Sequence, residues 1–152
     1  MQKNIIEREV YYNIIWSQDH RYEKYDASKV LPELPGIVCL MYREKSKTEY
    51  LIFYACWRDG CRVGLKKFLD PDFSRYAELA RRIDKEKLYY KYTVVDTKPT
   101  DLQDILYWLI KNYAPLYNSS NYEDSRRYRS INVKEGVMAH GDVVEKFHAT
   151  HR

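Results

Sequence analysis

The sequence predicts an α+β fold in which a small antiparallel or mixed central sheet carries packed helices. Two apolar runs, 36–42 and 50–57, flank a wholly polar stretch and are typical of a buried hairpin. A third run rich in aromatic and β-branched residues follows at 88–95, after a segment with helical spacing. A chain of 152 residues is long enough to enclose one modest core.

The elements before and within the hairpin follow from local composition. A strand is expected at 10–16, where β-branched and aromatic residues dominate. The polar segment 17–29 is expected to be a loop, and Pro32 and Pro35 bracket a rigid turn into the hairpin. Because both hairpin runs are apolar on both faces, the pair should lie at the centre of the sheet with helices over it.

Three helices are expected after the hairpin. A short helix is predicted at 64–69, and a longer one at 73–84, where apolar residues recur at helical spacing. The strongest helical pattern follows the third strand. Thr100 or Asp101 is expected to cap that helix, and Pro115 is expected to end it.

The composition changes after residue 118, where the chain becomes polar and rich in arginine. We therefore expect one domain at 1–118, with its core at 36–118, followed by a polar C-terminal extension at 119–152. The only element expected in that extension is a short strand at 131–133.

Composition limits the classes of function. The formal net charge of +4 is only mildly basic, whereas 16 tyrosines suit strand surfaces, interfaces and base stacking. Cys39, Cys56 and Cys61 lack the spacing of a metal site, so we expect small buried hydrophobic residues and no disulfide framework. No apolar stretch approaches the roughly 20 residues that span a bilayer. The expected setting is therefore the cytoplasm, without a membrane partner.

Two motifs in this order resemble the GIY-YIG nuclease family. The first hairpin strand opens with Pro-Gly-Ile-Val at 35–38, and the last helix ends in Leu-Ile-Lys-Asn-Tyr-Ala-Pro-Leu-Tyr-Asn at 109–118. In that family a Gly-Ile-Tyr strand pairs with a Tyr-Ile-Gly strand, and a helix with an arginine follows. A later helix bears a metal-binding glutamate and runs into a Pro-x-Tyr-Asn ending. The resemblance covers just over half of the chain and implies a GIY-YIG-like domain.

The resemblance places several of the family's catalytic positions on residues that lack the required groups. The first tyrosine falls on Val38 and the glutamate falls on Leu106. Two registers of the second motif stay open, with either 53–55 or 50–52 in its place. The implied pseudo-active site comprises Arg62 and Asn118 together with Val38, Phe53, Tyr54 and Leu106.

A leucine offers no oxygen to a hard cation such as Mg²⁺. We therefore expect the hydrolysis typical of the family to be impaired, and no cofactor to be bound. Binding to DNA or RNA is the function that the resemblance still implies, because basic residues flank the pseudo-active site and one arginine run contains a tyrosine. The expected nucleic-acid contacts are Arg58, Lys66, Lys67, Arg126, Arg127 and Arg129.

Two alternatives stay open. An active endonuclease with a rearranged site would require Mg²⁺ and would need Asp101, Asp104, Glu78 or another acidic residue to reach the face of the sheet. A protein-interaction module is the other alternative, and it would form a homodimer through the strand at 10–16 or the extension at 119–152.

Overall fold

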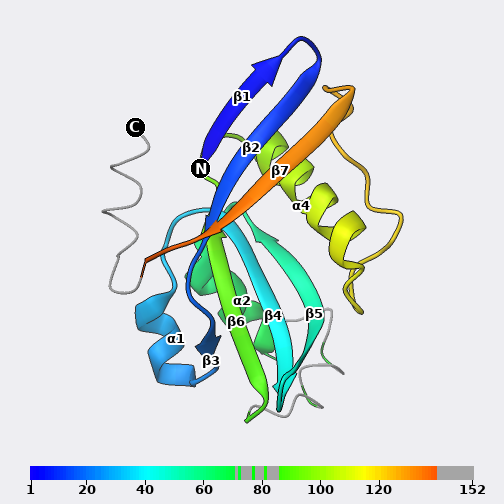
Figure 1. Cartoon of the computed structure of the whole chain (residues 1–152). Helices are drawn as coiled ribbons and strands as arrows, with labels where there is room; N and C mark the ends of the chain where they lie inside the picture. Colours follow the sequence, from blue (N-terminus) through cyan, green and yellow to red (C-terminus); the bar gives the residue numbers. More distant parts are fainter. Residues whose placement is uncertain (71, 73–76, 78–80, 82–85, 140–152) are drawn as a thin grey trace.

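The computed structural model describes the chain apart from residues 71, 73–76, 78–80, 82–85 and 140–152. The described part has two sheets with helices packed on them, as Figure 1 shows. The α+β class is confirmed, with the strands divided between two sheets instead of one. The strands are β1 (Gln2–Ile6), β2 (Glu9–Trp16), β3 (His20–Arg21), β4 (Gly36–Glu44), β5 (Lys47–Cys56), β6 (Leu88–Val94) and β7 (Ser130–Val137). The helices are α1 (Lys24–Val30), α2 (Gly60–Leu69) and α4 (Pro99–Tyr113).

The three-stranded sheet has β2 at its centre, with β1 antiparallel on one side and β7 parallel on the other. The expected strand at 10–16 is confirmed, and alternate side chains of β2 are buried. β7 pairs with β2 along 8 residues and is therefore longer than the strand expected at 131–133. Polar residues and a glycine separate its apolar residues, so the local composition indicates only a short strand. The polar extension thus contributes a strand to the N-terminal sheet.

The four-stranded sheet has the order β3-β6-β4-β5, and the expected hairpin of β4 and β5 is confirmed. β4 lies inside the sheet and is buried from Gly36 to Met41, which explains its unbroken apolar run. β5 lies at the edge and not at the centre. The segment after α4 covers this edge, because Leu116 N donates to Tyr50 O at 3.2 Å and Tyr117 N donates to Leu51 O at 2.9 Å.

Two expectations about the helices that precede β6 need correction. The segment 17–29 is not a loop throughout, because β3 and most of α1 lie within it. The sequence of this segment is polar and typical of a loop, because α1 buries only Ala27 among the described side chains of the helix. α2 begins at Gly60, one turn before the expected start. A Cβ added to Gly64 would lie 2.2 Å from the Sγ atom of Cys56, so glycine lets α2 approach the end of β5.

The long helix expected after the third strand is confirmed as α4, but its ends differ from the expectation. Lys98 is the N-cap residue, and a proline occupies the first turn. Neither Thr100 nor Asp101 caps the helix, because both lie inside its first turn. Ala114 adopts a left-handed conformation with φ of 45° and ends the helix one residue before Pro115.

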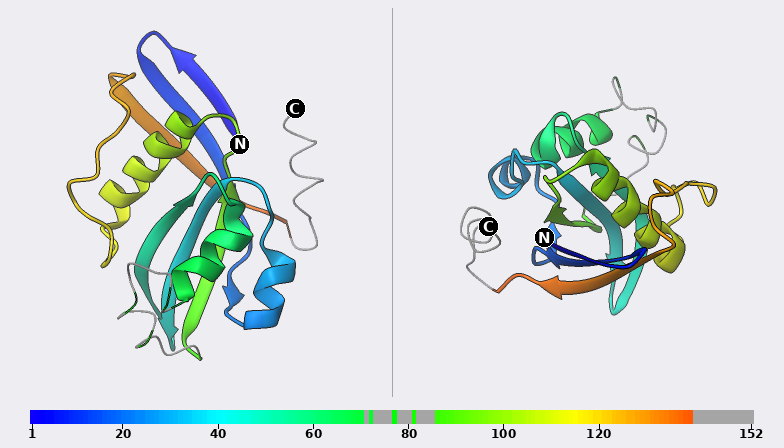
Figure 2. Two further views of the ribbon diagram at one scale, coloured as in Figure 1. Left: turned by 180° about the vertical axis from the view of Figure 1, so that it is seen from behind. Right: turned by 90° about the horizontal axis from the view of Figure 1, so that it is seen from above.

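The two faces of the four-stranded sheet bury two separate apolar clusters. α1 and α2 cover one face, where Leu31, Leu65 and Phe68 pack against Val38 and Leu40. α4 and the three-stranded sheet cover part of the other face, and the views in Figure 2 show this arrangement from behind and from above. Burying apolar surface on both faces is what holds the helices and the second sheet in place.

The helix predicted at 73–84 falls on residues that lie mostly outside the described part of the chain. Within the described part, no helix has the length and apolar character that crossing a membrane requires.

Candidate functional site

The pseudo-active-site side chains are divided between opposite faces of the four-stranded sheet. Phe53 and Leu106 are 1% and 4% exposed and pack in the cluster beneath α4. Val38 and Tyr54 pack in the cluster beneath α2, where the ring centroids of Tyr54 and Phe68 are 5.4 Å apart. Consecutive residues of a strand point to opposite faces, so Phe53 and Tyr54 cannot share a site. The structure does not bring these side chains together.

The hairpin register explains this separation. Val38 lies opposite Tyr54, and the next residue, Cys39, lies opposite Phe53. The opening motif at 36–38 therefore pairs with 54–56. The pairing shifts by one residue just beyond Leu40, so the segment at 50–52 pairs further along β4.

Arg62 and Asn118 are occupied by contacts within the protein. The Arg62 guanidinium donates to Leu31 O at 2.9 Å and to the Glu33 carboxylate at 2.9 Å. The Asn118 side chain accepts from Phe53 N at 2.8 Å and donates to Phe53 O at 3.0 Å. Asn118 thus satisfies both main-chain groups of one residue at the edge of β5, as a neighbouring strand would.

Two buried carboxylates on α4, Asp101 and Asp104, connect the helix to distant parts of the chain. Asp101 is 1% exposed and accepts hydrogen bonds from the Tyr12 hydroxyl at 2.8 Å, the Lys3 ammonium at 2.7 Å and the Thr97 hydroxyl at 2.7 Å. Burial by itself would raise the pKa of Asp101. The hydrogen bonds from Lys3, Thr97 and Tyr12 outweigh burial and hold its pKa below the usual value.

Asp104 holds the segment that follows α4. Its carboxylate accepts from the Ser125 main-chain N–H and from the Ser125 hydroxyl, both at 2.7 Å. The Nη2 atom of Arg127 lies 3.2 Å from Asp101 and 3.4 Å from Asp104. Arg126 sits between these anchored neighbours with φ of 61°, a conformation that side-chain-bearing residues seldom adopt. We call Asp101, Asp104 and their partners the Asp101–Asp104 network.

Two of the acidic residues expected for a rearranged metal site therefore already accept hydrogen bonds within the protein. Asp101 and Asp104 are buried within the Asp101–Asp104 network, and Glu78 lies outside the described residues. In the described part of the chain, no group of three or more His, Cys, Asp or Glu side chains is placed to hold a metal ion. The three cysteines are free and buried, as expected for small hydrophobic residues, and burial raises the pKa of Cys39.

The arginine run expected to contact nucleic acid forms ion pairs within the protein. Arg126 lies 3.3 Å from Glu123, and Arg129 lies 3.9 Å from Glu9. Arg127 is bound by two buried carboxylates. Arg127 has a structural role in addition to the expected nucleic-acid contact, because removing its charge would leave the two buried carboxylates without one of their cationic partners.

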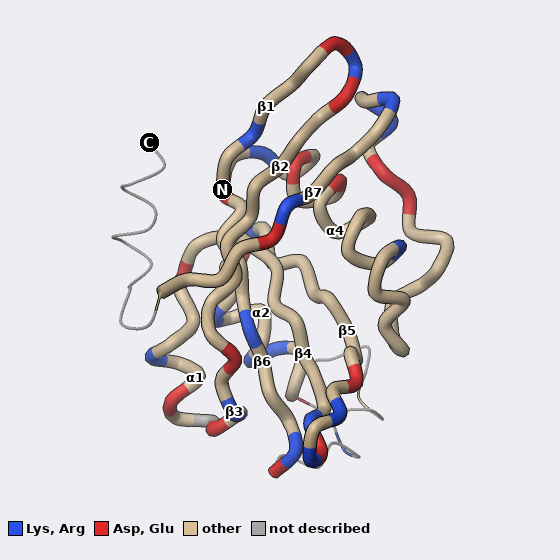
Figure 3. Tube along the Cα trace, viewed as in Figure 1, with Lys and Arg blue, Asp and Glu red and all other residues tan. Residues whose placement is uncertain are grey.

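The other expected contacts lie on α2 and just before it. Arg58 and Lys66 are exposed, and neither forms an ion pair with a described residue. Lys67 is paired with Asp59 at 2.7 Å, and both side chains are about half exposed. α2 contains no acidic residue, whereas Figure 3 shows both signs of charge distributed over the two sheets. We call Arg58, Lys66 and Lys67 the α2 cationic face.

One polar cluster was not anticipated from the sequence. The ammonium group of Lys91 lies 4.6 Å from the ring centroid of Trp16 and 5.9 Å from that of Tyr50. Glu135 accepts from Trp16 Nε1 at 2.7 Å and from the Tyr113 hydroxyl at 2.8 Å. Burial and this hydrogen bond raise the pKa of Tyr113. The side chains of this cluster come from five different elements, so no local pattern in the sequence predicts the cluster.

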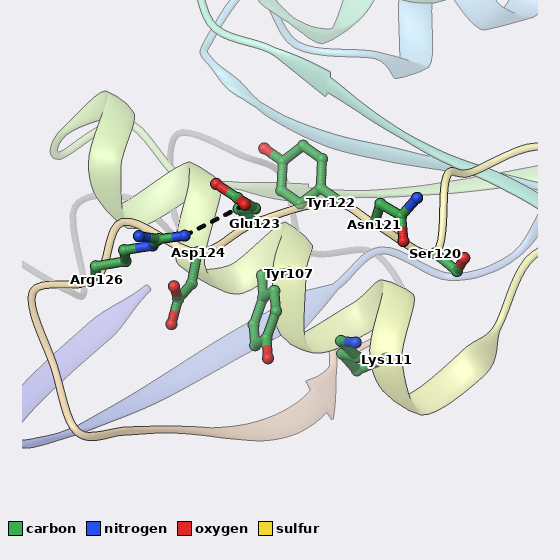
Figure 4. Close-up of a pocket in the computed structure, with 8 residues that line it drawn as sticks. All are labelled: Tyr107, Lys111, Ser120, Asn121, Tyr122, Glu123, Asp124 and Arg126. Atoms are coloured by element: carbon green, nitrogen blue, oxygen red, sulfur yellow. Dashed lines mark hydrogen bonds and ion pairs between the residues drawn. The ribbon is translucent and has the colours of Figure 1, made fainter.

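A pocket of about 430 Å³ lies between the outer side of α4 and the segment that follows it (Figure 4). Gln103 positions the opposite wall, because its amide donates to Glu123 O at 3.1 Å and to Asp124 O at 3.3 Å. The only signal in the sequence is the spacing of four residues that places Gln103, Tyr107 and Lys111 on one helix face. The lining residues are Tyr107, Lys111, Ser120, Asn121, Tyr122, Glu123, Asp124 and Arg126.

Comparisons with known proteins identify a family but no activity. A family model described as "Uncharacterised protein" matches residues 1–147. No curated protein and no solved structure matches the chain. The family match includes β1, β2 and β7 as well as the segment 36–118. The chain therefore belongs to this family of uncharacterised proteins.

Proposed function

We propose that this protein is a catalytically impaired GIY-YIG-like domain that binds nucleic acid through the α2 cationic face. Two features support the choice of partner. The motifs at 35–38 and 109–118 resemble those of a nuclease family. Hairpin, helix, third strand and final helix also follow one another in the order that the resemblance implies.

The observation that carries the proposal is the absence of acidic residues on α2. Nucleic acid is attracted by basic side chains that are not already neutralised by neighbouring carboxylates. Arg58 and Lys66 meet this condition among the described residues. The pair of Lys67 and Asp59 is exposed, and such pairs contribute only about 0–1 kcal/mol, so a phosphate can replace the carboxylate.

Binding without hydrolysis follows from the groups at the metal-binding position. A hard cation needs carboxylate oxygens, and Leu106 presents a methyl-bearing side chain that is 4% exposed in an apolar cluster. Asp104, two residues earlier, is fully buried and bound by Ser125 and Arg127. Neither residue offers free oxygen atoms for a metal-activated water, so we propose no bound cofactor.

A binding assay with charge-matched variants tests the proposal. Labelled single- and double-stranded DNA and RNA are titrated with the full chain at low ionic strength, and fluorescence anisotropy reports binding. The variant R58Q/K66Q should bind more weakly than the wild type, because it removes two phosphate contacts. The control K45Q/K47Q removes the same charge at the exposed tip of the β4–β5 hairpin and should bind like the wild type.

The outcomes separate the proposal from its competitors. No binding to any of the four nucleic acids at low ionic strength would contradict it, since phosphate contacts are strongest there. Equal loss in both variants would show general charge attraction instead of a binding face. Incubation of plasmid with wild type and Mg²⁺ or Mn²⁺ should leave it intact. Cleavage that disappears in folded Asp104→Asn protein would instead favour the endonuclease alternative.

A further inference from the structure

We propose that the pocket on the outer side of α4 holds one nucleotide, with its base between Tyr107 and Tyr122 and its phosphate at Lys111. This site is built from α4 and the segment 120–126, whereas the α2 cationic face lies on a different helix. The inference therefore goes beyond the proposed function and can hold or fail independently of it.

The two tyrosines supply stacking surfaces from opposite walls. Tyr107 projects from α4, while Tyr122 comes from the facing segment and packs its inner side against the core. Figure 4 shows the two rings separated from each other, with Tyr107 on α4 and Tyr122 on the facing segment. A planar base fits between two aromatic walls, and stacking accepts any of the bases because each has a π face. A volume of about 430 Å³ lies in the range of small-molecule sites.

The cations of the pocket favour an anionic group on the ligand. Lys111 follows Tyr107 by one helical turn, and its ammonium group lies 5.7 Å from that ring centroid. Among the described residues Lys111 forms no ion pair, so its charge is available to a phosphate. Arg126 is the second cation, and its pair with Glu123 is exposed on both sides and easily exchanged.

Three further lining residues offer hydrogen-bonding groups to the edge of a base. The carboxylate of Asp124 forms no ion pair with a described residue and can accept from an exocyclic amine. Asn121 and Ser120 add an amide and a hydroxyl group that can both donate and accept. Adenine, cytosine and guanine carry exocyclic amines, whereas uracil carries none, so the pocket should disfavour uridine nucleotides.

The wall opposite α4 is held in place before any ligand arrives. Gln103 binds the main-chain oxygens of Glu123 and Asp124, and Asp104 binds both the main chain and the hydroxyl of Ser125. Each anchor comes from α4 itself. Little conformational entropy is therefore lost when the pocket is filled, which favours binding by a small ligand.

The nucleotide can come from two sources. One source is a free mononucleotide, and the other is an unstacked residue within a single strand. A base inside a duplex is stacked and paired, and would have to be flipped out at a cost of a few kcal/mol to enter. The shared requirement is an accessible base with an attached phosphate.

The test is a two-dimensional ¹H–¹⁵N NMR titration of the labelled full chain. The probes are adenosine monophosphate, adenosine, uridine monophosphate, a short adenine single strand and its duplex. Saturable shifts at Tyr107, Lys111 and the amides of 120–126 are expected with adenosine monophosphate. Adenosine and uridine monophosphate should each bind about tenfold more weakly. Binding by the mononucleotide alone identifies a free nucleotide as the ligand, and tighter binding of the single strand identifies the strand.

Two variants make the assignment specific. Tyr107→Ala should weaken the binding of adenosine monophosphate about tenfold or more, because the stacking contact is lost. Lys111→Gln should weaken the binding of adenosine monophosphate and leave the binding of adenosine unchanged. The variant should therefore bind the nucleotide and the nucleoside with similar affinity. Shifts that map elsewhere, no saturation by any probe, or equal loss of nucleoside and nucleotide in Lys111→Gln would overturn the proposal.

A matched control distinguishes this site from the α2 cationic face. Lys66→Gln removes the same charge as Lys111→Gln and should leave mononucleotide binding unchanged. If Lys66→Gln weakens binding of the longer nucleic acids alone and Lys111→Gln weakens binding of the mononucleotide, both proposals hold. Loss of mononucleotide binding in Lys66→Gln would overturn the pocket assignment without affecting the other.

Discussion

The most informative perturbation of the fold is Asp101→Asn, which keeps the size of the side chain but removes its charge. Four hydrogen bonds to a carboxylate, from Lys3, Tyr12, Thr97 and Arg127, become bonds to a neutral amide. Each should lose about 1 kcal/mol, the usual difference between charged and neutral acceptors. Lys3 and Arg127 are 21% and 32% exposed, so water recovers part of this loss. We expect the free energy of unfolding to fall by about 2–3 kcal/mol.

The assay is urea denaturation followed by far-ultraviolet circular dichroism. The matched control is Glu33→Gln, which removes a carboxylate from an exposed pair with Arg62 and should cost only about 0–1 kcal/mol. If Asp101→Asn destabilises the protein no more than the control, the Asp101–Asp104 network does not hold the fold together and the reasoning is wrong.

The same variant has a predicted pH dependence. The pKa of Asp101 in the folded protein lies below its usual value, so the folded state favours the ionised form. The contribution of Asp101 to the free energy of unfolding is fully present above the pKa of an unfolded aspartate, about 3.9. This contribution is lost as the pH falls from there through the lower pKa of the folded state. The stability difference between wild type and Asp101→Asn should therefore be constant near neutral pH and shrink in acid. A difference that persists unchanged to the lowest pH at which both proteins fold would contradict this.

Three further substitutions test individual packing claims by urea denaturation. Asn118→Ala should lower the free energy of unfolding by about 1–3 kcal/mol, because it exposes two main-chain groups at the edge of β5. The control Asn112→Ala, at an exposed helix position, should leave the free energy of unfolding nearly unchanged. Equal effects of the two substitutions would refute the role of Asn118 at the strand edge. Leu106→Ala should cost about 2–5 kcal/mol by opening a cavity, whereas a loss near zero would place it outside the core. Gly64→Ala should destabilise by about 1–3 kcal/mol, since its Cβ would meet a buried sulfur at 2.2 Å; a neutral result would show that α2 can shift freely.

The sequence predicts those elements whose residues face a core directly. The run at 36–42 is unbroken because β4 is buried on both faces, and β2 alternates because only one of its faces is covered. The pattern of α4 is strong for the same reason. By contrast, α1 buries little and looks like a loop. β7 gains its stability from pairing with β2, more than 100 positions away, which local composition does not reveal.

The site residues were harder to place for two physical reasons. An aspartate in a first helical turn has the composition of a cap, but at Asp101 the tertiary partners Lys3 and Tyr12 decide its role. An arginine next to a tyrosine resembles a phosphate-binding pair, and the sequence does not reveal that Arg127 pairs with two buried carboxylates. Charge and spacing indicate which groups can bind a ligand, and only tertiary contacts show which of them are already occupied.

The claim that this domain binds nucleic acid through the α2 cationic face is tested most directly by the salt dependence of binding. For duplex DNA, the logarithm of the binding constant should fall against the logarithm of salt concentration with a slope of about −2 to −3, one contact each for Arg58, Lys66 and Lys67. R58Q/K66Q should make this slope shallower by about two. No measurable binding at low salt, or the same slope in wild type and variant, would contradict the account.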